Sequence, residues 1–310
     1  MTAPAPATHA AARPRRVAWL YVAVTALAMT GVAAGWQVVA RRRLDAAVVA
    51  TATEQVDHAR GVFDSLRART VAGLMSECRV LVEDPRLKAS LATPDVDEAT
   101  LHDILADILR LRRAGFLLVL SPEARVFAQA GADELRGIDL SGSSVMSRAR
   151  GASDAVGGAW VIGGKLTDVA VASVRFDRAV LAYVVVGQAV DQALVKAVDD
   201  STGTAVAVLV GSEPAPTSTA DPRLAAVFQV IAADAAARPA RLIERDGDDY
   251  LAASFELEGT PPTHPRLAAA RSLAAPRDRF GSFTWLLWAP CGLVLLGVVL
   301  GAMRFREGPS

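Results

Sequence analysis

The sequence predicts an α+β protein in which two transmembrane helices flank a long helix and two tandem antiparallel sheets. Three observations support this fold class. Two uncharged stretches, residues 17–40 and 283–303, each reach the roughly 20 residues that a helix needs to span a bilayer. Residues 41–114 carry apolar side chains at helical spacing. Residues 115–280 consist mainly of short apolar runs separated by turn-forming residues, a pattern typical of antiparallel strands.

The two uncharged stretches are predicted to anchor the chain in the inner membrane of a bacterial cell. Aromatic residues near their ends fit the interfacial belts of membrane helices. The first stretch could instead be a cleaved signal peptide, but it exceeds the usual apolar core of about 7–15 residues. The second could be a buried core helix. We expect the tails, residues 1–16 and 304–310, to be cytoplasmic and residues 41–282 to be extracytoplasmic.

Composition argues against several functional classes. The 33 basic residues are balanced by 33 acidic ones, so bulk charge does not predict nucleic-acid binding. Cys78 and Cys291 are too few for a disulfide scaffold or a Cys-based zinc site, and the four His residues are scattered. Residues 158–165 approach a phosphate-binding loop, but the glycine spacing is wrong and Leu166 replaces the Ser or Thr. We therefore expect no enzymatic activity, no metal and no cofactor.

Residues 41–114 are predicted to form a helical stalk followed by lead helices. A new helix should begin at Pro85, and a further one should cover residues 97–113 and end at Gly115. The stalk has a weak seam with 4-3-4-3-4 spacing, which indicates either a parallel dimer helix or an amphipathic helix packed on its own domain. The seam residues are Val48, Ala52, Gln55, Ala59, Val62 and Leu66.

Residues 115–201 are predicted to form a membrane-distal sheet. A short helix at 143–150 should separate the second strand from the third, and a helix over 189–201 should follow the last strand. The strands are expected at 116–120, 126–130, 159–162, 166–176 and 179–188.

Residues 202–280 are predicted to form a smaller, membrane-proximal sheet. Asp221 should cap a helix with Pro222 at its first position, and Asp246-Gly247 should make a hairpin turn. Residues 211–220 are expected to be a loop rich in Pro, Ser and Thr. The strands are expected at 205–210, 241–244, 250–257 and 267–273, so this unit looks like a reduced version of the first.

The order of these elements resembles the double Cache family of extracytoplasmic sensors, which contain two PAS-like domains. The resemblance covers about residues 41–280 and implies a dimeric receptor that binds a small molecule in the distal sheet and shifts its membrane helices. Family members usually carry a cytoplasmic output module on the same chain. Because the tails here are short, we expect the output to come from another chain or from sequence outside these 310 residues. The local likenesses are Glu83-Asp84-Pro85-Arg86-Leu87, Phe116-Leu117-Leu118-Val119-Leu120 with Val126-Phe127, Ala182-Tyr183-Val184-Val185-Val186-Gly187, Thr202-Gly203 and Asp246-Gly247-Asp248-Asp249-Tyr250.

Five residues in or beside the last three distal strands are candidates for ligand binding. Polar and aromatic side chains on the ligand face of a sheet can hydrogen-bond to a small molecule or stack on it. Alternatively, the polar candidates face solvent and the two aromatic ones pack in the core. The candidates are Trp160, Lys165, Asp168, Arg175 and Tyr183. No catalytic or metal-binding residue is predicted.

Together these observations predict a membrane-anchored sensor subunit. It would bind a small molecule, act as a homodimer and transmit a conformational change through its transmembrane helices to a separate cytoplasmic or membrane partner. The ligand can shift this equilibrium only through its different affinity for the two states. The alternative is a structural or assembly protein of the cell envelope that uses the two sheets as a protein-interaction platform.

Overall fold

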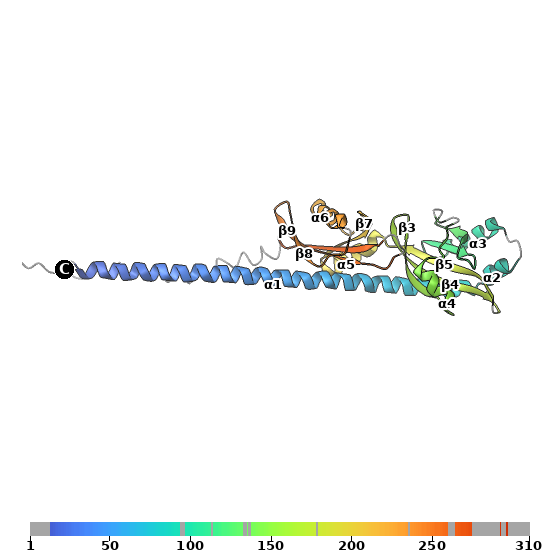
Figure 1. Ribbon diagram of the computed structural model, residues 1–310, viewed down its shortest axis with the longest axis horizontal. Coiled ribbons are helices and arrows are strands. Elements are labelled where there is room, and N and C mark those ends of the chain that lie inside the picture. The colour runs from blue at the N-terminus through green and yellow to red at the C-terminus, as the bar shows by residue number, and fades with distance from the viewer. Residues whose placement is uncertain are drawn as a thin grey trace, which may run out of the picture. The chain divides into compact units, whose positions relative to one another are not determined.

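The computed structural model describes residues 13–93, 97–112, 114–132, 135, 138–177, 179–234, 236–259, 264–274, 292 and 296. The chain divides into two compact units. One comprises residues 1–50 and 273–310, and the other comprises residues 51–272. Both sheets belong to the second unit, so the candidate site is described within that unit (Figure 1).

The lead segment is a long helix followed by two shorter ones. α1 (Arg13–Val82) ends before Asp84, whose carboxylate accepts hydrogen bonds from the Arg86 and Leu87 amides and caps α2 (Pro85–Ala92). Proline suits the first position of a helix because the missing N–H would have no helical partner there. α3 (Glu98–Arg110) follows. The predicted helix break at Pro85 is therefore confirmed.

The distal sheet has five antiparallel strands in the order β2-β1-β5-β4-β3. After β2, the helix α4 (Ser144–Gly151) begins at Ser143, whose hydroxyl accepts a hydrogen bond from the Met146 amide. α5 (Gln192–Thr202) follows the last strand and ends at Gly203, which adopts a left-handed φ of 63°. The strands are β1 (Phe116–Leu120), β2 (Val126–Ala130), β3 (Val156–Ile162), β4 (Lys165–Phe176) and β5 (Ala179–Ala189).

The proximal sheet repeats this topology, with the order β7-β6-β10-β9-β8. It is not a reduced version of the first sheet, because β7 lies within the segment expected to be a loop. β7 contains two prolines, which an edge strand tolerates because one side of it needs no ladder hydrogen bonds. α6 (Pro222–Ala233) is capped by Asp221. The strands are β6 (Ala205–Val210), β7 (Glu213–Thr217), β8 (Arg241–Arg245), β9 (Asp248–Glu256) and β10 (Arg266–Ser272). In Figure 1, β3 to β5 and β7 to β9 form separate groups.

Two arginines of β10 bind carbonyls at the C-terminal ends of α5 and α6. Arg266 is 4% exposed and donates hydrogen bonds to the carbonyls of Ile231, Ala232 and Ala236 at the end of α6. Arg271 donates to the carbonyls of Thr202 and Gly203 at the end of α5. Carbonyls at the C-terminal end of a helix carry a partial negative charge, which favours a cation there. The two helices are thereby tied to the same strand.

The distal sheet has two apolar faces, each covered by helices. On one face, α1 contributes Leu74, Cys78 and Leu81 to a core that includes the small residues Ala170 and Ala172 of β4. On the other face, α4 contributes its buried residues to a core that includes the two aromatic candidates, Trp160 and Tyr183. We call these the α1 face and the α4 face. Successive side chains of a strand alternate between them.

Along residues 51–82, α1 buries one side against its own unit. Ala52 and Ala59 of the predicted seam are 3% and 0% exposed, and Phe63 on the same side is 0% exposed. The packing of the stalk on its own domain therefore accounts for these seam positions. The dimer stays a prediction.

The membrane prediction concerns two stretches, of which the structure describes the backbone of the first and two residues of the second. Residues 17–40 are helical within α1, whereas residues 283–303 lie outside the described residues except for 292 and 296. No helix among the described residues is long and apolar enough to cross a membrane. The two spans and the orientation of the tails stay predictions.

Candidate functional site

The α4 face of the distal sheet carries buried polar atoms that have no partner. The Trp160 side chain on β3 is 2% exposed, and its Nε1 has no hydrogen-bond partner among the described residues. The same holds for Oε1 of Gln129 on β2, a residue that is 3% exposed. A buried polar atom without a partner loses its hydration and gains nothing in return, at a cost of about 1–3 kcal/mol. Each is a place where a ligand can supply the missing partner.

These two atoms mark separate places on the face. β2 and β3 are the two edge strands, and four strand spacings of about 4.8 Å separate them by roughly 19 Å. Gln129 pairs with Leu118 of β1, and Trp160 pairs with Thr167 of β4. One small molecule would therefore contact only one of the two.

The place beside Trp160 has a second polar group. Thr167 lies directly opposite Trp160 across the β3–β4 ladder and is 2% exposed. Its hydroxyl donates to the Lys165 carbonyl at 3.4 Å, a long and weak hydrogen bond that a better acceptor can replace. Lys165 itself is exposed at the start of β4. Trp160 and Thr167 therefore offer an indole N–H and a hydroxyl to one ligand.

Two adjacent glycines bring helices close to both faces of β3 at this point. A Cβ on Gly157 would lie 2.2 Å from Cγ1 of Val71 in α1. A Cβ on Gly158 would lie 2.5 Å from Cγ2 of Val145 and 2.8 Å from the guanidinium of Arg148, both in α4. Real Cβ atoms do not approach this closely, so only glycine permits this packing. The strand that carries Trp160 is held between α1 and α4.

The structure disperses the other sequence-predicted candidates. Tyr183 lies on the α4 face. Thr167 pairs with Ala189 of β5, and Tyr183 is six residues before Ala189 on that strand. At about 3.4 Å per residue, Tyr183 is therefore roughly 20 Å from Thr167 along the sheet. Arg175 is exposed and donates to the Ser173 hydroxyl and the Ala152 carbonyl. Neither residue meets Trp160.

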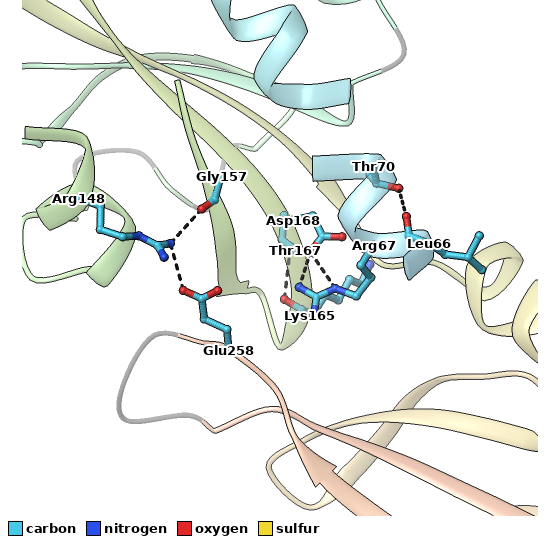
Figure 2. Close-up of polar contacts among 9 residues, drawn as sticks. All are labelled: Leu66, Arg67, Thr70, Arg148, Gly157, Lys165, Thr167, Asp168 and Glu258. Carbon is cyan, nitrogen blue, oxygen red and sulfur yellow. Dashed lines mark hydrogen bonds and ion pairs between the residues drawn. The ribbon is translucent and has the colours of Figure 1, made fainter. Parts of the chain in front are cut away.

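Asp168 lies on the α1 face. Its side chain is 1% exposed and its Oδ1 accepts hydrogen bonds from Nε of Arg67 in α1, at 2.9 Å, and from an Nη of the same guanidinium (Figure 2). Burial raises the pKa of Asp168, the nearby charge of Glu258 adds to the rise, and the Arg67 guanidinium opposes it. Asp168 thus joins the sheet to the long helix.

A second ion pair lies close to the first and links the distal and proximal parts of the unit. Arg148 of α4 donates to the Gly157 carbonyl at 2.9 Å and to Glu258, just after β9, at 3.1 Å (Figure 2). Both side chains are about half exposed, so this pair adds little stability.

Sequence reasoning missed Thr167, Gln129 and Arg67. The first two are polar residues within apolar strands, a detectable signal because a buried polar group needs a partner. Arg67 gives no such signal, because one arginine on a polar helix face looks like any solvated residue. No group of acidic, His and Cys residues suited to a metal ion occurs in the described part of the chain.

Comparison with known proteins finds sensor domains. No family model and no curated protein matches the sequence. Among solved structures, the sensory domain of the Campylobacter jejuni chemoreceptor Tlp3 is similar at 9% identity and a TM-score of 0.44, over 74% of this chain and 96% of that one. The sensor domain of the V. cholerae histidine kinase DctB is similar at 12% identity and a TM-score of 0.47, over 73% and 97%. A domain of a putative sensory box/GGDEF family protein from Vibrio parahaemolyticus is similar at 11% identity and a TM-score of 0.43, over 73% and 97%. These names describe sensory proteins, the class of protein that the predicted resemblance names.

Proposed function

We propose that this chain is a membrane-anchored extracytoplasmic sensor subunit that binds a small molecule on the α4 face of the distal sheet. The helix α1 would pass the resulting change to the membrane, where a separate partner protein would respond. The observation that carries this proposal is the position of α1. One continuous helix, Arg13–Val82, packs on the face of the distal sheet opposite to the face that bears the unpartnered Trp160 indole.

The geometry supports a route by which binding on one face would reach the other. A ligand seated against Trp160 and Thr167 would push on β3 and β4, whose opposite sides contact α1 through Gly157 and Asp168. Strands in a close-packed sheet do not absorb such a displacement, because interiors have few voids. The change would therefore appear in α1.

The site also suggests a general ligand chemistry. Trp160 Nε1 can only donate a hydrogen bond, so the ligand must present an acceptor such as a carbonyl or carboxylate oxygen. The flanking side chains of the α4 face, including Val169 and Ile162, are apolar. A small, partly apolar molecule with at least one oxygen acceptor fits these groups.

The test is a thermal-shift screen of the purified full chain in detergent against a panel of small metabolites. A ligand at a hundredfold excess over its dissociation constant adds about 2.7 kcal/mol of apparent stability. Trp160→Phe keeps an aromatic ring at this position but removes the indole N–H together with part of the ring system, so it should abolish the shift of any hit. Lys196→Ala, on the exposed surface of α5, is the matched control and should keep the shift.

Two results would contradict the proposal. A folded chain that shows no shift across the panel would favour the envelope interaction platform. A hit that is retained by Trp160→Phe would place the ligand elsewhere.

A further inference from the structure

The buried ion pair between Arg67 and Asp168 is unusual for its position. It joins α1 to the start of β4, at one end of a contact to which α1 contributes the apolar residues Leu74, Cys78 and Leu81. The side chains are 12% and 1% exposed, and both guanidinium hydrogen bonds go to the same carboxylate oxygen. Burying two charges has a large desolvation cost, which the attraction between them offsets only in good geometry.

Stability alone does not explain this pair. Replacing a buried ion pair by apolar side chains of similar volume is often neutral or stabilising. The rest of the contact is apolar and already well packed, since Leu74 and Cys78 of α1 lie against Ala170 of β4. A role in specifying the arrangement of the two elements is therefore the alternative to a role in stability.

The remainder of the contact positions the helix by shape and by weak thiol hydrogen bonds. On the sheet side it includes the small groups Gly157, Ala170 and Ala172, and the Cys78 thiol of α1 donates to the Ala170 carbonyl at 3.8 Å and to the Val184 carbonyl at 3.3 Å. Apolar contacts are non-directional, and a thiol is only a weak hydrogen-bond donor. Hydrogen bonds in a guanidinium–carboxylate pair are directional, and a shift of one helical residue, about 1.5 Å, would break them.

We propose that the Arg67–Asp168 ion pair sets the register of α1 on the distal sheet and is the contact through which the two move together. Asp168 lies next to β3 in the ladder, opposite Ala159, and Glu258 lies close enough to influence its charge. The register is therefore set where the two sheets of the unit meet. This proposal names the coupling contact of the proposed sensor, but the register is a property of the chain without any ligand.

The experiment measures the position of α1 directly. Nitroxide labels are placed on two exposed residues, Ala72 of α1 and Phe176 of β4, in a Cys78→Ala, Cys291→Ser background. Double electron–electron resonance then gives the distribution of distances between the labels in the full chain in detergent. The parent should give one narrow population.

The decisive variant is the apolar pair Arg67→Met, Asp168→Leu. We expect a broadened or second distance population with a melting temperature close to that of the parent. Arg67→Lys keeps the charge and loses the two-bond geometry, so it should broaden the distribution less. The matched control is Arg79→Met, Asp154→Asn, which removes an exposed ion pair from the same helix, with side chains 48% and 62% exposed. It should leave the distribution unchanged.

Two results would overturn the proposal. The first is an unchanged narrow distribution in the apolar double variant. The second is a melting temperature that falls as far in the double variant as in Arg67→Met alone, because the pair would then serve stability. Neither result depends on a ligand, so failure of the ligand screen and failure of the register test remain distinguishable.

Discussion

Adding one methyl group at Gly187 should destabilise the distal sheet. Gly187 of β5 lies directly opposite Phe116 of β1, and the Phe116 ring, 6% exposed, covers it. A Cβ at Gly187 would lie 2.1, 2.4 and 2.8 Å from three carbons of that ring. Carbon atoms normally approach to about 3.5–4.0 Å, so the ring would have to retreat by more than about 1 Å in a packed core. Such overpacking costs about 1–3 kcal/mol.

The assay is urea unfolding of the purified Gly187→Ala chain, followed by circular dichroism. The free energy of unfolding should fall by about 1–3 kcal/mol at an unchanged slope with urea. Phe116→Leu shortens the obstructing side chain, so it should cost less in the Gly187→Ala background than in the parent. The coupling energy should be about 0.5–3 kcal/mol.

A glycine in open space provides the control. Nothing lies within 4 Å of a Cβ at Gly61 of α1, so Gly61→Ala should stabilise the helix by about 0.5–1 kcal/mol. The steric reasoning is refuted if Gly187→Ala is as stable as the parent, or if Phe116→Leu costs the same in both backgrounds.

Three further predictions concern buried side chains. Arg266→Met should lower the free energy of unfolding by about 1–3 kcal/mol, measured by urea titration, because the carbonyls of Ala232, in the last turn of α6, and Ala236, just after it, lose their donor. Burial raises the pKa of Asp168, so its contribution to stability is fully present below about pH 3.9 and is lost as the pH rises through the higher folded-state pKa. As the pH increases from about 3.9 through the folded-state pKa, the melting temperature of the parent should therefore fall relative to that of Asp168→Asn. A rise over this pH range would show that the pKa of Asp168 is lowered in the folded chain, not raised. Burial also raises the pKa of the Cys78 thiol to about 12, so in a Cys291→Ser chain it should react with a maleimide only after unfolding. Labelling of the folded chain at pH 8 would contradict this.

The secondary structure was largely predictable because local rules govern it. Asp84-Pro85 and Asp221-Pro222 each begin a helix, as their cap and first-position chemistry requires. The exception was β7, which has two prolines and little alternation. It is a strand because β6 offers it a free edge, and this partner is not visible in the local sequence.

The candidate site was only partly predictable. Trp160 was a candidate because it is an aromatic residue in one of the last three predicted distal strands, but its unpartnered Nε1 depends on what surrounds it. Tyr183 was a sound candidate by type and lies on the same face, yet the register places it roughly 20 Å away along the sheet. Pairing of strands far apart in the chain sets such distances.

Thr167 and Asp168 show most clearly what the sequence determines and what only the folded structure determines. Alternation along a strand already requires that these neighbours face opposite sides of the sheet. It does not say which side α4 covers and which side α1 covers. Only the folded arrangement puts Arg67, 101 residues earlier in the chain, against Asp168 and leaves Thr167 beside Trp160. Periodicity is a local property of the chain, whereas the choice of partner depends on how distant elements bury their apolar surfaces together.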